Sequence, residues 1–314
     1  TANGKINPLE LEKILYMVIS DRHVLEELER IYPGSIEECE GYRHIDGELI
    51  TANIDKLSNA LYKRILEIYV ASKKAEYQEL QKRLPVMKLE FLGKFLSIVR
   101  KHDLAVSEGY IKKIVAEIPV VVGDNIINHT GCEAVGYFDS NANTIVMTTM
   151  MPGDMNLSAD NDSYLEESLF HTYAHELLHA ISGQDIMGHT DEEDSSLEYH
   201  DIQRLGLSII NRFGWLNEAI TEETTCEILQ TEQGIYSEER DLVQLIIENS
   251  HGHIPFELLQ NAYFEHHRKD SELTYLPKLI QAFNKAYGVG FLVKLDNVIR
   301  EHGIEAGIEF ITEA

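Results

Sequence analysis

The sequence predicts an α+β protein that is mostly helical, with a helical N-terminal region over residues 1–117 and a second domain over residues 118–314. Apolar residues recur at helical spacing through most of the first region. At Ile118 the composition changes to short β-branched runs, and helical spacing returns from Ser163 onward. We therefore expect the second domain to combine a small antiparallel sheet, a buried helix and a set of C-terminal helices.

In the N-terminal region, helices are expected wherever apolar residues repeat every three or four positions. The pattern predicts helices over residues 7–20, 21–32, 54–84, 87–101 and 108–116. Pro85 is expected to end the third of these, because proline has no amide hydrogen to donate to the preceding turn.

The second domain is expected to begin with short strands over residues 119–123, 134–138 and 144–150, with a turn at 139–143. A polar loop follows at 152–162, and the chain then reads as helical to its end. Amphipathic helices predicted over residues 255–268, 271–287 and 291–302 are expected to serve packing rather than chemistry.

The charge balance excludes some classes of partner. The formal net charge is −26, and all charged residues between Pro119 and Tyr236 are acidic except Arg204 and Arg212. Nucleic-acid binding needs clustered cations, so no nucleic-acid partner is expected. The acidic stretch indicates either a solvated surface or a negative cleft that attracts cationic substrates. No apolar run is long enough to predict a membrane span.

The cysteines give only a weak indication of compartment. Cys39, Cys132 and Cys226 are widely spaced and odd in number, which does not resemble a disulfide framework. Free thiols favour a reducing cytosol. The sequence begins at Thr1 rather than methionine, so a removed leader and export stay open.

The most informative segment reads HELLH over residues 175–179, inside an apolar run that predicts a buried helix. Residues four apart lie on one face of a helix, so His175 and His179 can bind a single Zn²⁺. Glu176 lies beside the first ligand, where it can act as a general base. The alternative is a helix with two surface histidines. Unpaired imidazoles in an apolar run would cost desolvation, which favours the metal.

A second segment reads NEAITE over residues 217–222. It resembles the NExxx(D/E) segment of the gluzincin metalloproteases, the thermolysin-like clan. The resemblance implies that Glu218 is the third zinc ligand and that Glu222 hydrogen-bonds one zinc-binding histidine. Independently, these two carboxylates are one helical turn apart and face the same way. The stretch between His179 and Glu218 is longer than in thermolysin, and residues 191–194 within it have no assignment.

The resemblance implies a zincin-like core and a metallopeptidase that uses Zn²⁺ to hydrolyse a peptide or protein substrate, with Glu176 as the general base for a zinc-activated water. The predicted strand at 144–150 would be the sheet edge that pairs with an extended substrate. Gluzincins usually add a Tyr or His that stabilises the oxyanion. Tyr236 is the preferred candidate here, and the others are Tyr199, Tyr275 and Tyr287, each with core packing as the alternative.

Other ligand assignments and functions stay open. Asp185 is a rival third ligand, since some zincins use an Asp shortly after HExxH. His171 cannot share one ion with both His175 and His179, because eight helical residues span about 12 Å; a supporting role fits it better. Four further histidines are expected to be ordinary surface residues: His189, His200, His251 and His253. The rival functions are a narrow-specificity toxin or effector-type protease and a catalytically silent zincin-fold binding protein.

Overall fold

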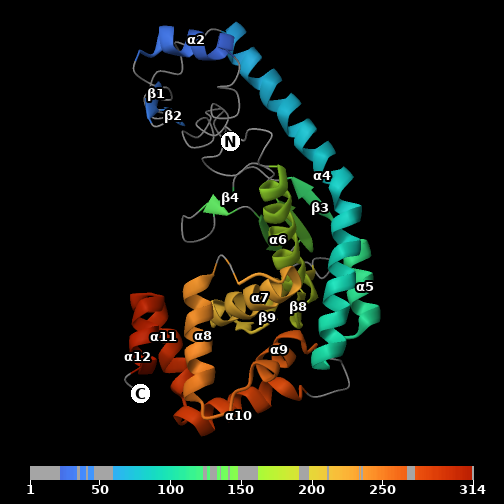
Figure 1. Ribbon diagram of the computed structural model, residues 1–314, viewed down its shortest axis with the longest axis vertical. Helices are drawn as coiled ribbons and strands as arrows, with labels where there is room; N and C mark the ends of the chain where they lie inside the picture. Colours follow the sequence, from blue (N-terminus) through green and yellow to red (C-terminus); the bar gives the residue numbers. More distant parts are fainter. Residues whose placement is uncertain are drawn as a thin grey trace. The chain divides into compact units, whose positions relative to one another are not determined.

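The computed structural model describes residues 22–33, 36–39, 42–45, 59–122, 126–127, 133–134, 136–140, 142–147, 162–190, 198–210, 212–232, 234, 236–266 and 273–312. These residues form a mostly helical α+β structure with small sheets, as the sequence predicts (Figure 1). In chain order the elements are α2 (Arg22–Ile31), β1 (Ile36–Cys39), β2 (Tyr42–Ile45), α4 (Asn59–His102), α5 (Glu108–Glu117), β3 (Val120–Val122), β4 (Ile126–Ile127), β5 (Glu133–Ala134), β6 (Gly136–Asp139), β7 (Thr144–Met147), α6 (Asp162–Ile181), β8 (Gln184–Thr190), β9 (Glu198–Leu205), β10 (Ser208–Ile209), α7 (Gly214–Leu229), α8 (Ser237–Asn249), α9 (Phe256–Phe264), α10 (Tyr275–Tyr287), α11 (Phe291–His302) and α12 (Ile304–Thr312).

The chain divides into two compact units that interleave along the sequence. One comprises residues 1–85, 121–137 and 146–169, and the other comprises residues 86–120, 138–145 and 170–314. Every residue that the sequence predicts to bind metal or to catalyse belongs to the second unit. The predicted domain boundary at residue 118 stays a prediction.

The helix α4 corrects one expectation, because it continues through Pro85 rather than ending there. Its apolar stripe stays in phase on both sides of the exposed proline. Burying a Leu, Met or Phe stabilises a fold by roughly 1.5–3 kcal/mol, whereas a proline inside a helix costs about 3 kcal/mol. The burial therefore outweighs the lost hydrogen bond. The buried residues of this stripe are Leu80, Leu84, Met87, Phe91 and Phe95.

Helices α2 and α5 confirm the predictions for residues 21–32 and 108–116. The start of α5 follows from its sequence, because the Ser107 side chain accepts a hydrogen bond from the Tyr110 amide at 3.2 Å. The helix predicted over residues 7–20 lies outside the described part of the chain.

The predicted strands form a three-stranded sheet in the order β3-β7-β6. For the described residues of the predicted edge strand, 144–147, this order corrects the expectation, because β7 has a neighbour on both sides. Ile145 and Met147 of β7 are fully buried, as suits a central strand. Pairing β7 with an extended substrate is therefore excluded, since both of its hydrogen-bonding sides are occupied.

A β-hairpin interrupts the region that the sequence predicts to be helical after Ser163. Strands β8 and β9 pair antiparallel from Gln184 opposite Leu205 to Thr190 opposite Glu198. The turn from α6 into β8 occurs at Gly183, whose amide donates to the Tyr263 carbonyl at 2.8 Å. Backbone approaches this close leave no room for a side chain, so the helix ends here.

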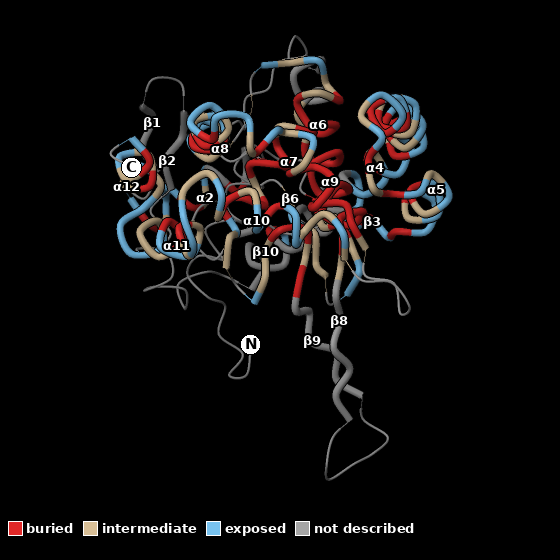
Figure 2. Tube along the Cα trace, turned by 90° about the horizontal axis from the view of Figure 1, so that it is seen from below, coloured by how far each residue is buried: buried red, intermediate tan, exposed pale blue. Residues whose placement is uncertain are grey.

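Helices α6, α7 and α9 form much of the buried interior of the second unit (Figure 2). The aromatic rings of Phe91, Phe95 and Phe264 pack in series, and Tyr173 of α6 meets Phe91 edge-on at 6.4 Å. Helix α7 is buried on nearly every side, including its polar residues. Buried polar residues need hydrogen-bond partners. The polar residues of α7 must therefore contact polar groups of neighbouring elements, and a functional site is expected along this helix. Among the described residues, none of the helices qualifies as a candidate membrane span.

Candidate metal centre

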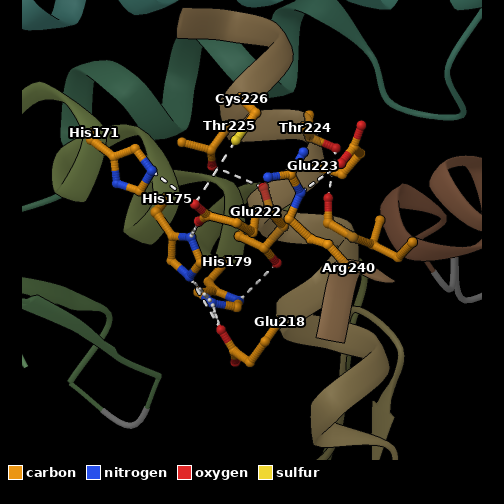
Figure 3. A network of polar contacts seen from close by, with 12 residues as sticks. His171, His175, His179, Glu218, Glu222, Glu223, Thr224, Thr225, Cys226 and Arg240 are labelled. Carbon is orange, nitrogen blue, oxygen red and sulfur yellow. Dashed lines mark hydrogen bonds and ion pairs between the residues drawn. The ribbon is translucent and has the colours of Figure 1, made fainter. Parts of the chain in front are cut away.

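Two helices of the second unit supply the site. Helix α6 carries His171, His175 and His179 at one-turn intervals, and α7 carries Glu218 and Glu222 one turn apart (Figure 3). The start of α7 is held by Asp296, which accepts a hydrogen bond from the Phe213 amide at 2.8 Å. Helix geometry sets the spacing of these side chains along each helix, whereas tertiary packing brings the two helices together.

Three of these side chains converge on one point. The distance from His175 Nε2 to Glu218 Oε2 is 3.1 Å, and His179 Nε2 lies 3.2 Å from both of those atoms. The imidazoles are buried, and the Glu218 side chain is 28% exposed. Among the residues that the structure describes, this is the group of histidine, cysteine and carboxylate side chains that could hold a metal ion.

The triangle of donor atoms fits a small divalent cation. Zinc–nitrogen and zinc–oxygen bonds of about 2.0–2.1 Å in tetrahedral geometry place neighbouring ligand atoms about 3.3 Å apart. The three edges of the triangle, at 3.1–3.2 Å, are close to that separation. Two imidazole nitrogens and one carboxylate oxygen are also the donor set of catalytic zinc sites with one open position.

Glu222 contacts the Nδ1 side of the His175 ring. Glu222 Oε2 lies 2.8 Å from His175 Nδ1, and the Glu222 side chain is fully buried. A carboxylate can only accept here, so Nδ1 carries the proton. When Nε2 binds a metal, its lone pair is thereby directed toward Glu218 and His179.

His179 is oriented by a different set of residues. Its Nδ1 lies 3.5 Å from Thr221 Oγ1, which is itself 2.8 Å from the Tyr263 hydroxyl. Asn217 Nδ2 lies 3.3 Å from the same Nδ1. When Nε2 binds a metal, Nδ1 carries the proton, and Thr221 Oγ1 is the hydroxyl oxygen placed to accept it. Sequence reasoning missed Tyr263, because its position along the chain carries no motif.

Glu176 is buried beside the triangle, with only 8% of the residue exposed. Burial raises the pKa of its carboxyl, while His175, His179 and a hydrogen bond from the Phe138 amide act in the opposite direction. The contact with Phe138 connects Glu176 to β6, a neighbour of β7 in the three-stranded sheet.

The charges of the cluster are strongly coupled. Burial lowers the pKa of His175, but hydrogen bonds to Glu218 and Glu222 outweigh it and raise that pKa to about 10. Burial favours protonation of Glu218, yet His179 and His175 hold the pKa of this carboxyl well below its usual range. The metal-free site therefore keeps a proton on His175 between two carboxylates, in the place that a cation would take.

Of the candidate tyrosines, Tyr236 lies at the site. Its ring stacks on His175 with centroids 5.3 Å apart and planes at 19°. Burial and the neighbouring Glu218 and Glu176 raise the pKa of Tyr236, which keeps its hydroxyl protonated as a donor. Tyr287 instead donates to the Ile246 carbonyl and stacks on Phe291. The ring of Tyr275 lies beneath the Lys278 ammonium.

Several sequence candidates are not brought into the cluster. His251 and His253 lie between α8 and α9. The side chains of four others lie outside the described part of the structure, namely Asp185, His189, Tyr199 and His200. Asp185 therefore stays an untested alternative ligand.

Comparison with protein-family models, with curated proteins and with solved structures finds no match.

Proposed function

We propose that this protein is a zinc-dependent metallopeptidase of the gluzincin type, with a zincin-like domain over residues 118–314. The proposal depends chiefly on one observation, the triangle of His175, His179 and Glu218 with edges of 3.1–3.2 Å. Its donor types and spacing match a catalytic zinc site. The HExxH and NExxxE motifs that carry these residues support the same assignment.

Each residue has a separate role in the proposed reaction. When bound, the ion supplies Lewis-acid activation of water and of the scissile carbonyl. Glu176 accepts a proton from the attacking water and delivers it to the departing amine. Tyr236 donates its hydroxyl hydrogen to the oxygen that becomes negative in the transition state. Glu222 keeps the His175 ring in the tautomer that leaves Nε2 free.

Metal analysis provides the first test. Purified wild type should retain one zinc per chain, and Glu218→Ala should lose most of it because the third ligand is gone. Glu223→Ala is the matched control, since this neighbouring carboxylate pairs with Arg240 at 2.7 Å rather than with the triangle. Stoichiometric zinc in Glu218→Ala would overturn the ligand assignment and favour Asp185.

Hydrolysis of a fluorogenic peptide library provides the second test. Glu176→Gln should bind zinc as wild type does but lose turnover, because the amide cannot accept the proton. Normal turnover in that variant would refute the base assignment. Zinc binding without chelator-sensitive hydrolysis in wild type would instead indicate a silent binding protein. The cleavage profile tests the preference for basic residues that the acidic charge of the chain favours.

A further inference from the structure

The Glu222 carboxylate contacts two histidines of α6 rather than one. Its Oε2 lies 2.8 Å from His175 Nδ1, and its Oε1 lies 2.9 Å from His171 Nε2 (Figure 3). The His171 side chain is 13% exposed, whereas Glu222 is fully buried. The rings of His171 and His175 are nearly parallel, with centroids 6.4 Å apart and planes at 19°.

We propose that His171 is a positioning residue of the metal centre, which acts through Glu222 on His175. The proposal deepens the proposed function and rests on zinc binding by the triangle. His171 Nε2–H donates to one carboxylate oxygen, and the other oxygen is thereby held where it accepts from His175 Nδ1. The metal-facing nitrogen of His175 is then directed by a chain of two hydrogen bonds.

The freedom of a glutamate side chain explains why a second donor matters. The terminal torsion of glutamate has a broad energy minimum, so one hydrogen bond leaves the plane of the carboxylate poorly defined. Donors on both oxygens define that plane. The Cys226 thiol also reaches Oε1, at 3.9 Å, but a thiol is a weaker donor than the His171 N–H. The backbone of Gly234 lies close to the same oxygen that contacts His171, since a Cβ on this glycine would lie 2.5 Å from Glu222 Oε1. The carboxylate is therefore packed as well as hydrogen-bonded in this orientation.

A role in packing alone does not account for an imidazole at this position. Ala174 and His175, three and four residues on and thus on the same face of α6, are buried, so an apolar side chain would continue the covered face. Placing an imidazole against a buried carboxylate costs desolvation that only a hydrogen bond recovers. His171 cannot be a ligand itself, because eight helical residues separate it from His179, or about 12 Å.

The test compares zinc affinities by competition with a chromophoric chelator. His171→Leu should weaken zinc binding about tenfold. This is the lower end of the loss of metal affinity that follows when a residue that orients a metal ligand through hydrogen bonds is replaced. His171→Gln should restore most of the affinity, because its amide nitrogen can occupy the place of Nε2 and donate to Glu222. This second variant also keeps the test decisive if His171→Leu fails to fold.

The matched control is His102→Leu. His102 Nε2 lies 2.9 Å from Glu227 Oε1, and the two side chains are 19% and 28% exposed, so the pair resembles His171–Glu222 without touching the centre. His102→Leu should lower the urea midpoint of the metal-free protein as His171→Leu does, yet leave zinc affinity unchanged. Equal zinc affinities for the two leucine variants would overturn the proposal.

A double-mutant cycle shows whether the effect passes through Glu222. In a Glu222→Ala background, His171→Leu should cause no further loss of zinc affinity, because the carboxylate it positions is absent. Additive losses would show that His171 acts by another route and would refute the proposal. Wild type that binds no zinc would refute the proposed function itself. Wild type that binds zinc, with His171→Leu unchanged, would refute the positioning role alone.

Discussion

Replacing Gly183 by alanine should destabilise the second unit. A Cβ built on this residue would lie 2.0 Å from the Glu265 carbonyl oxygen and 2.7 Å from the Arg204 guanidinium. Because such contacts essentially never fall below 3.0 Å, the two backbone segments must separate by about 1 Å or more. That separation disrupts the 2.8 Å hydrogen bond from the Gly183 amide to the Tyr263 carbonyl.

The expected cost is about 3 kcal/mol, at the upper end of overpacking penalties, because the obstacle is backbone rather than a flexible side chain. With a urea m-value of about 3 kcal/mol/M, the unfolding midpoint should fall by about 1 M. Trp215 is the single tryptophan and is buried in α7, so its fluorescence reports unfolding next to the site.

Gly93→Ala is the matched control for this measurement. Gly93 lies within α4, and a Cβ there would meet nothing within 4 Å. Alanine should therefore stabilise the helix by about 0.5–1 kcal/mol. Unfolding of Gly183→Ala at the wild-type urea concentration, with Gly93→Ala stabilised as expected, would show that the close backbone approach at Gly183 does not limit stability.

Three further predictions concern the site. Tyr236→Phe keeps the ring stacked on His175, so zinc content should be unchanged while kcat falls about 10²–10³-fold, as for loss of an oxyanion donor; unchanged kcat in a steady-state peptide assay would remove Tyr236 from the mechanism. The folded pKa of His175 is raised in the metal-free site, so its contribution to stability is present below pH 6.5 and lost as pH rises through about 10. Urea midpoints of the chelator-treated protein should decline across that interval and should not decline as steeply in His175→Gln. Zinc binding at neutral pH should also release protons, which calorimetry in buffers of different ionisation enthalpy would detect.

Local spacing accounts for the parts of the site that could be predicted. His175, Glu176 and His179 are within one turn of a helix, so their relative positions follow once the apolar run predicts the helix. The same holds for Glu218 and Glu222 on α7. The pairing of the two segments came from resemblance to a family motif, because helical periodicity alone gives no information about which helices meet.

Other expectations failed where tertiary packing decides. Pro85 lies within α4 because the apolar stripe on both sides is buried, and a local rule for proline does not include that burial. Strand β7 is central because β3 and β6 flank it, an order that the pattern of each strand does not specify. The β8–β9 hairpin begins where Gly183 meets the backbone of another segment.

The mostly helical class of the protein and the two short motifs, whose side chains share a helix face, follow from the order of the amino acids alone. In contrast, helix packing brings Glu218 to 3.2 Å from His179 across 39 residues and brings Glu222 into contact with His171 across 51. Tyr263 likewise meets Thr221, and Tyr236 meets His175, only because other helices pack there. Backbone geometry fixes the relative positions of residues only within one or two helical turns. Contacts between distant segments depend instead on how the whole unit buries its apolar surface.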